Sequence, residues 1–484
     1  MIDHDVIFRT SVEEPGAELA PSSGVIPSDL EGTLLRNGPG DFSIGGEPLH
    51  FFDGYGMVAG VSFRGGRAYY RARFVESALY RAERTAGKQV QRRGFSNLPN
   101  RWKNLGNINL ANAVMHDAFA FGGRLFATDE GGYYRLNPKT LETLEEDRWA
   151  GRVGPRDKMA PVPHVDRRLN RLLGYKVAQK PLVADVVTFY EFGADGGVLV
   201  ETPHTLRNSF GFCHELAFTE HWYVLVEMPV KVDLAGVLWG VRTAFDCFER
   251  VPGQSPVVHL VPRDPRSGRT ARSVAIPGDA VAQFHLGNAF EEGKSVVFDS
   301  ASYAWPAFAY FGPPALRARG PQPPPVGPVP TYRRTRIDLR SGAVAVTDLA
   351  DNVELPRIND AFHGVPSRYA YLIGTDASSG VPDPFVWATC VVRVDASDAA
   401  KQIWNAGPSS FLSQPAFAAR RGSTAEDDGY VLVWVVDGRG DGRSAVVILD
   451  AASLAAGPIA TIPLSSFITL ASHCRFEPEM SLFP

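Results

Sequence analysis

The chain has 484 residues, and 49 Lys and Arg against 53 Asp and Glu give it a formal net charge of −4. This balance argues against a nucleic-acid-binding protein, which normally carries a basic excess, and 29 Phe, 15 Tyr and 8 Trp residues exclude an unfolded chain. The four cysteines are scattered without a Cys-x-x-Cys pair, which excludes a disulfide scaffold and a thiolate zinc site and favours a reducing compartment.

Short β-rich runs separated by turn residues follow one another along most of the chain. Residues 122–144 predict two strands around a Gly-Gly turn, and residues 186–201 and 429–451 each predict a hairpin with Gly-rich or Asp-Gly turns. Such a pattern of short strands without alternating helices indicates a sandwich, a barrel or a propeller. Roughly 30 short strands are too many for one barrel or sandwich, so the length favours a propeller.

Two segments depart from this pattern. Residues 230–251 have an apolar face and predict a short helix, and residues 310–330 are Pro-rich and predict an extended surface insert. We therefore expect a single domain over residues 1–484 with cap inserts near 230–251 and 304–330. The N-terminus lacks a basic region followed by an apolar stretch, and no run of about 18 apolar residues occurs, so the expected location is the cytoplasm.

Four of the eleven histidines stand where a loop enters an apolar strand or near the end of the chain, namely His164, His214, His285 and His473. The inner strands of a propeller converge on one axis, so histidines at their starts can meet although they are far apart in sequence. The spacing alone does not identify a metal site, because no local ligand motif of the His-Glu-x-x-His kind is present.

Seven motifs occur in an order that resembles the carotenoid cleavage oxygenase family, which includes apocarotenoid oxygenases, stilbene cleavage oxygenases and the retinoid isomerohydrolase. The resemblance runs from about Val25 to His473. The motifs are EGTLLRNGPG, HFFDGYGMV, PHVDRRLNRLLGY, FCHELAFTEHWYVLVEMP, FHLGNAFEEG, ELPRIND and AEDDGYVLVWVVD.

The resemblance implies an all-β fold, a seven-bladed β-propeller with a loop and helix cap over the metal face, and a non-haem Fe(II) ion on its axis. Carried over by motif, the metal ligands are His164, His214, His285 and His473. The other seven histidines, His116 among them, match no ligand motif. Four neutral imidazoles suit a ferrous ion and leave up to two coordination positions open for O₂.

The resemblance also implies carboxylates that accept hydrogen bonds from the ligand imidazoles and fix their tautomers. Glu130 and Glu354 match two of these positions; exposed strand-end acids are the competing interpretation. At the third position this chain has Gln414, which can accept a hydrogen bond but carries no charge. Glu426 is the acid that could replace it. Cys474 also departs from the family pattern, since a glycine usually follows the last histidine.

Two phenylalanines are candidates for a substrate tunnel. Phe212 lies two residues before His214, so both face the same side of a strand, and Phe284 adjoins His285. Packing in the core is the alternative for both. Asp129 stands where stilbene-cleaving relatives have a lysine that binds a phenol. An acidic side chain cannot replace that lysine, so the sequence argues against a stilbene substrate and favours a polyene.

The leading hypothesis is a non-haem Fe(II) dioxygenase that cleaves a C=C bond of an apocarotenoid or carotenoid to two carbonyl products. The alternatives are stilbene or phenylpropene cleavage, or an isomerase or binding protein on the same scaffold that does not activate O₂. The expected partners are a hydrophobic polyene and O₂, with no nucleic acid. Residues 234–248, with Trp239, are expected either to make a peripheral membrane contact or to form a lid, and Trp305, Phe308 and Phe311 to extend the same patch.

Overall fold

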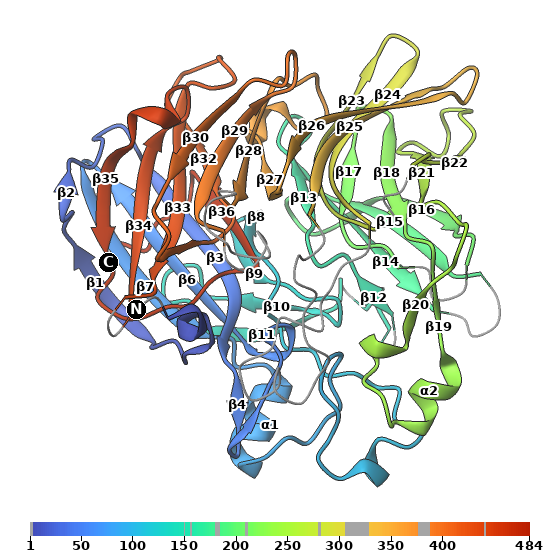
Figure 1. Cartoon of the computed structure of the whole chain (residues 1–484), viewed down its shortest axis with the longest axis horizontal. Helices are drawn as coiled ribbons and strands as arrows, with labels where there is room; N and C mark the ends of the chain where they lie inside the picture. The colour runs from blue at the N-terminus through green and yellow to red at the C-terminus, as the bar shows by residue number, and fades with distance from the viewer. Residues whose placement is uncertain are drawn as a thin grey trace.

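Seven β-sheets are arranged around a common axis in a computed structural model of the chain (Figure 1). The structure describes residues 3–149, 151–154, 157–179, 184–208, 212–278, 282–304, 329–375, 388–439 and 442–484. The predicted seven-bladed β-propeller is therefore confirmed. The Pro-rich segment 310–330 and the residues Trp305, Phe308 and Phe311 lie almost entirely outside the described residues.

The first blade joins the two ends of the chain. Its strand order is β1 (Glu14–Leu19), β7 (Arg67–Phe74), β6 (Tyr55–Arg64), β3 (Gly32–Asp41) and β36 (His473–Glu477). The C-terminal strand β36 thus pairs with the N-terminal strand β3, and Asn37 lies opposite His473 in this register. Pairing of the two chain ends closes the ring of blades, which otherwise would leave exposed sheet edges.

The next three blades follow in chain order. Blade 2 contains β11 (Thr143–Asp147), β10 (Tyr133–Leu136), β9 (Arg124–Ala127) and β8 (Ala118–Phe121). Blade 3 contains β12 (Lys158–Met159), β14 (Arg171–Ala178), β15 (Val186–Phe192) and β16 (Val198–Thr205), with β13 (His164–Asp166) paired to β14. Blade 4 contains β17 (Leu216–Phe218), β18 (Trp222–Glu227), β21 (Val257–Pro262) and β22 (Arg272–Ala275).

The last three blades complete the ring. Blade 5 contains β23 (Ala282–Glu292), β24 (Ser295–Tyr303), β25 (Thr331–Asp338) and β26 (Val344–Asp351). Blade 6 contains β27 (Val353–Arg357), β28 (Tyr369–Gly374), β29 (Cys390–Asp395) and β30 (Lys401–Asn405). Blade 7 contains β2 (Ser23–Gly24), β35 (Pro458–Pro463), β34 (Arg443–Asp450), β33 (Gly429–Asp437) and β31 (Ser410–Leu412), with β32 (Ala416–Ala419) paired to β33.

Small elements connect and cover the blades. Two short ribbons are formed by β4 (Ser43–Ile44) with β5 (Glu47–Pro48), and by β19 (Val230–Val232) with β20 (Phe248–Arg250). In the described parts of the chain, the helices are α1 (Ala78–Ala86), α2 (Leu234–Trp239) and the 3₁₀ turns η1 (His4–Phe8), η2 (Phe51–Asp53), η3 (Arg101–Lys103), η4 (Phe245–Cys247), η6 (Asp360–Phe362) and η8 (Leu454–Ala456). Among the described residues, no helix combines the length and the apolar character needed to span a membrane.

Burial follows the position of each strand within its blade. The strand β33 reads GYVLVWVVD and is buried along almost its whole length, because neighbouring blades cover both of its faces. The outer strand β16 alternates between exposed and covered residues instead. Apolar residues between adjacent blades, such as Met57 with Trp434, form the core. The predicted hairpins over residues 186–201 and 429–451 are both present, as β15–β16 and β33–β34.

The inner edges of the blades contact one another around the axis. The strand β36 contacts β8 and β32, and β23 contacts both β17 and β27. The residues that begin these inner strands therefore lie close together although the chain separates them widely. This arrangement positions the histidines described next.

Candidate metal centre

Three buried histidines converge at the inner edges of three blades. His473 is the first residue of β36, His285 lies in β23, and His214 precedes β17 by two residues. One ring nitrogen from each lies within 4.8 Å of the others, and the ring centroids are 5.4 Å apart for His214 and His285 and 5.2 Å apart for His285 and His473. Three imidazoles facing one point form a donor set that suits a borderline divalent metal ion.

Glu354 orients His285. The Nδ1 atom of His285 lies 2.8 Å from Glu354 Oε2, and the other carboxylate oxygen accepts a 2.7 Å hydrogen bond from the Tyr303 hydroxyl. Burial alone would lower the pKa of His285, but the adjacent Glu354 carboxylate outweighs it and raises that pKa. A carboxylate only accepts, so Nδ1 carries the proton, and Nε2 is the nitrogen whose lone pair can bind a metal ion.

Gln414 makes the corresponding contact with His473. Gln414 Oε1 accepts from His473 Nδ1 at 3.1 Å, from the Cys474 backbone N–H at 3.0 Å and from Arg357 Nη2 at 3.0 Å. Burial and the charges of nearby His285 lower the pKa of His473 well below its ordinary value. Glu426 does not replace Gln414, since its carboxylate accepts from the backbone N–H groups of Arg368 and Tyr369.

Glu130 faces His214 at a longer distance. Its Oε1 atom is 3.9 Å from His214 Nδ1, beyond hydrogen-bond length, and its Oε2 atom is 3.9 Å from Lys158 Nζ. Burial would raise the pKa of Glu130, but His214 and Lys158 lower it. The three residues that the resemblance singles out as acceptors, Glu130, Glu354 and Gln414, therefore face the Nδ1 atoms of the three clustered histidines.

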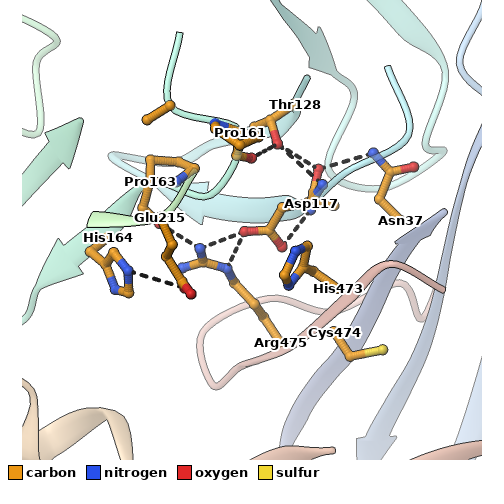
Figure 2. Close-up of polar contacts among 12 residues, drawn as sticks. Asn37, Asp117, Thr128, Pro161, Pro163, His164, Glu215, His473, Cys474 and Arg475 are labelled. Carbon is orange, nitrogen blue, oxygen red and sulfur yellow. Dashed lines mark hydrogen bonds and ion pairs between the residues drawn. The ribbon is translucent and has the colours of Figure 1, made fainter. Parts of the chain in front are cut away.

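The fourth predicted ligand, His164, lies outside this group. Its Nε2 atom is 3.5 Å from Glu215 Oε1 (Figure 2). Its ring centroid is 5.3 Å from that of His363 and 6.1 Å from that of Phe218. The strand register explains the difference. Val162 forms a parallel bridge with Glu215, next to His214, so His164 is two residues, or about 7 Å, further along the strand.

His116, which matches no ligand motif, also lies beside the cluster. The ring centroid of His116 is 5.6 Å from that of His214, and His116 Nδ1 is 3.2 Å from Asp129 Oδ1. Burial would raise the pKa of Asp129, but the neighbouring His116 lowers it. The sequence carries a usable signal, because His116 precedes β8 by two residues just as His214 precedes β17 by two.

Aromatic side chains extend from the cluster toward the segment 230–251. The ring of Phe284 is 5.7 Å from His214 and 5.8 Å from Phe212. Phe212 in turn contacts Phe248 at 5.4 Å and Phe245 at 6.3 Å. The two predicted tunnel residues, Phe212 and Phe284, thus belong to a continuous series of contacting aromatic rings between the histidines and the segment that carries α2. Phe284 is buried in a hydrophobic cluster against which Phe212 packs.

Backbone strain flanks the same residues. Val114, two residues before His116, has φ +55°, and Leu355, next to Glu354, has φ +53°. Positive φ is costly for a β-branched or bulky residue, on the order of 1–3 kcal/mol, and such strain is concentrated at functional sites. The neighbouring hydrogen bonds stabilise it: the Val114 N–H donates to Asp129 Oδ2 at 2.7 Å, and the Leu355 N–H donates to Glu354.

Comparison with known proteins agrees with this geometry. Residues 8–478 match the retinal pigment epithelial membrane protein family. The chain is 31% identical to the apocarotenoid-15,15'-oxygenase of Synechocystis over 93% of this chain and 91% of that protein. It is 27% identical to an isoeugenol monooxygenase of Pseudomonas nitroreducens (94% of each chain) and 26% identical to a rat beta,beta-carotene 15,15'-dioxygenase (98% and 92%).

Solved structures show the same fold. The crystal structure of cobalt-substituted Synechocystis apocarotenoid oxygenase superimposes with a TM-score of 0.87 at 27% identity and covers 97% of both chains. The chain belongs to the retinal pigment epithelial membrane protein family, the group of carotenoid cleavage oxygenases whose motifs the sequence carries. The relatives named above are oxygenases, and they support an oxygenase role for this chain.

Proposed function

We propose that this protein is a non-haem Fe(II) dioxygenase that cleaves one C=C bond of an apocarotenoid or carotenoid to two carbonyl products. The observation that supports it best is the convergence of His214, His285 and His473, each with Nδ1 facing an acceptor, beside an aromatic surface. These imidazoles would hold a ferrous ion, which would supply the redox chemistry that activates O₂.

The residues around the cluster have distinct tasks in this proposal. Glu354 and Gln414 hold the protons of His285 and His473 on Nδ1, which keeps both Nε2 atoms available to the metal. Phe212 and Phe284 line the approach and exclude water from the reacting bond. Alkene plus O₂ already balances two carbonyl products, so no external reductant enters the reaction.

The length of the series of contacting aromatic rings favours an extended apolar substrate. It continues from Phe284 through Phe212 to Phe245, whose ring stacks on Phe95 at 4.3 Å. A polyene can contact several rings in succession, whereas a phenylpropene is short enough to contact only the first. Cleavage of a phenylpropene is the second candidate, because isoeugenol monooxygenase is among the relatives.

Incubation with a panel of apocarotenals, hydroxystilbenes and isoeugenol under ¹⁸O₂, read by mass spectrometry, tests this proposal. Rapid reduction of the products to alcohols prevents exchange of the label with water. We expect cleavage of an apocarotenal with one ¹⁸O atom in each product and no turnover under argon. Label in only one product, with exchange excluded, would contradict a dioxygenase, and turnover under argon would favour an isomerase.

We also propose that the segment 234–248 contacts a membrane surface from which an apolar substrate is taken. Leu238 and Trp239 of α2 are 41% and 69% exposed, and Trp102 of η3 is 77% exposed. The two segments are joined, since the Gly106 N–H donates to the Leu238 carbonyl at 2.7 Å. Exposed aromatic and aliphatic side chains grouped on neighbouring loops are typical of an interfacial contact.

A further inference from the structure

We propose that His116 is the fourth histidine ligand of the metal centre, in the role that the motif resemblance assigned to His164. The inference rests on the metal site proposed above and specifies its ligands for this chain. Four observations support it: the position of His116, the way its segment is held, the nitrogen that faces its acceptor, and the surroundings of His164.

His116 lies against the clustered histidines. Its ring is 5.6 Å from that of His214, compared with 5.4 and 5.2 Å for the two ring pairs inside the cluster. Its nitrogens are not part of the group within 4.8 Å, so binding requires its side chain to rotate toward the other three. The His116 side chain is 17% exposed and therefore has more room to turn than a fully buried residue.

The segment that carries His116 is tied to the strand that carries His473. Asn37, which pairs with His473 in the sheet, donates to the carbonyl oxygens of Val114 at 3.1 Å and Asp117 at 3.0 Å. Arg475, two residues after His473, donates through Nε to Asp117 Oδ2 at 2.6 Å (Figure 2). These contacts flank His116 on both sides and fix its backbone relative to His473.

The acceptor pattern of His116 matches that of the three clustered histidines. In His214, His285 and His473 the nitrogen that faces a carboxylate or amide oxygen is Nδ1, and in His116 Nδ1 faces Asp129. A partner on Nδ1 leaves Nε2 for a metal ion and increases the basicity of the imidazole. His164 has the opposite arrangement, because the nitrogen that faces Glu215 is Nε2.

The ring of His164 faces Glu215 and not the clustered histidines. The carboxylate of Glu215 faces His164 at 3.5 Å and accepts from the backbone N–H of Leu286 at 2.6 Å, so the neighbour of His285 holds it in place. Val162, two residues before β13, pairs with Glu215 next to His214 and so lies level with the cluster, but it is fully buried and offers no ligand atom. The described part of blade 3 therefore offers no ligand at this level, and in this proposal His116, which precedes the first strand of blade 2, takes that place.

The test compares metal binding by His116→Ala, His164→Ala and His214→Ala with that of the unmodified protein. Iron per chain is measured after purification, and iron loss is followed in the presence of a chelator. Metal-free protein is then titrated with Co(II), whose visible spectrum depends on the number and geometry of its ligands. His164→Ala is the matched control, because both histidines are largely buried and each faces a carboxylate.

We expect His116→Ala to lose iron at least about tenfold faster than the unmodified protein, since even changes in residues around metal ligands cost 10–100-fold. His164→Ala should stay within about twofold of the unmodified protein. Added imidazole should restore the Co(II) spectrum of His116→Ala, because it can occupy the space of the missing ring. His116→Gln, which keeps the side-chain volume, should behave like His116→Ala and guards against a folding defect.

Three results would overturn the inference. The first is iron retention by His116→Ala equal to that of the unmodified protein, and the second is an iron loss in His164→Ala as large as in His214→Ala. The third is a Co(II) spectrum of folded His116→Ala that imidazole does not change, which would assign His116 a structural role. Failure of the metal site itself is a separate outcome, in which the unmodified protein and His214→Ala are equally free of iron.

Discussion

The Nδ1 atom of His285 lies 2.8 Å from Oε2 of Glu354, and both side chains are almost completely buried. The two residues belong to adjacent blades, His285 to β23 and Glu354 to β27, so this contact joins blades 5 and 6 at the axis of the propeller. Burying a carboxylate is costly unless it is hydrogen-bonded, and Glu354 also accepts from Tyr303. The Glu354 carboxylate therefore places a buried negative charge beside the site where a divalent cation would be bound.

Replacing Glu354 should weaken metal binding through the loss of its charge, even where the side-chain shape is kept. Glu354→Gln keeps the shape and can still accept from His285 Nδ1, but it removes the charge, so we expect about tenfold faster iron loss to a chelator. Glu354→Ala removes the acceptor as well and should approach the upper end of about 100-fold. Glu426→Gln, which alters an acid that binds backbone N–H groups away from the cluster, is the control and should leave iron retention unchanged.

Gln414 offers the converse substitution. Gln414→Glu keeps an oxygen for His473, Cys474 and Arg357 and adds a charge, although it loses the 3.3 Å hydrogen bond from Gln414 Nε2 to the Pro356 carbonyl. We expect tighter iron retention and unchanged or higher turnover, because charge-assisted hydrogen bonds are about twice as strong as neutral ones.

Gln414→Leu should have the opposite effect, since it leaves His473 Nδ1 and Arg357 without this acceptor in a buried site. His473 should accordingly be the ligand that is most easily released. Chelator competition on the three proteins measures both effects. Changes of less than about twofold in both variants, well below the usual 10–100-fold range, would mean that Gln414 only fills space.

Much of the arrangement of this site could be predicted from the sequence, and the remainder depends on strand register and long-range contacts that motifs do not record. Apolar runs and turn residues predict the blades, and the motif resemblance singles out His214, His285 and His473, which the structure brings together. The position of His164 could not be predicted in this way, because a shift of two residues preserves the face of a strand and its hydrophobic pattern while moving the side chain by about 7 Å. Only the pairing of Val162 with Glu215 reveals that shift.

The proximity of His116 to the cluster could not be predicted, for a different reason. This histidine precedes its strand as His214 does, but no motif surrounds it, and its partner Asp129 was interpreted only through the lysine of stilbene-cleaving relatives. Contacts such as those from Asn37 and Arg475 to the segment 114–117 join residues 77 to 358 positions apart. Local sequence patterns carry no information about such contacts.

The exposed residues of α2 provide a test of membrane contact. Leu238→Glu combined with Trp239→Glu should reduce sedimentation with phospholipid vesicles severalfold, because two apolar side chains would no longer enter the interface. Iron content should not change. Ile403→Glu, at an exposed apolar residue of blade 6, is the control and should bind vesicles like the unmodified protein. Equal vesicle binding by all three proteins would favour a lid.

His363 should make stability depend on pH. Burial, with smaller contributions from His164 and Arg357, lowers the pKa of His363 from 6.5 to about 3. Below pH 6.5 the unfolded chain therefore binds a proton that the folded protein does not, and the free energy of unfolding decreases as the pH falls. His363→Gln should lessen this decrease by up to about 2 kcal/mol between pH 6.5 and pH 5.

Chemical denaturation of both proteins at pH 8, 6.5 and 5 measures the effect of His363. The pH 8 value serves as the reference, since histidine is neutral there in both states. Parallel curves for His363→Gln and the unmodified protein across this range would show that His363 does not contribute to the pH dependence.

The central claim, a metal centre built on His214, His285 and His473, is tested most directly by titrating metal-free protein with Fe(II) under argon. The account predicts about one ferrous ion bound per chain by the unmodified protein, because these imidazoles offer one converging donor set. It predicts no binding above background by the triple variant His214→Ala, His285→Ala, His473→Ala. Equal binding by the two proteins, or none by the unmodified protein, would contradict it.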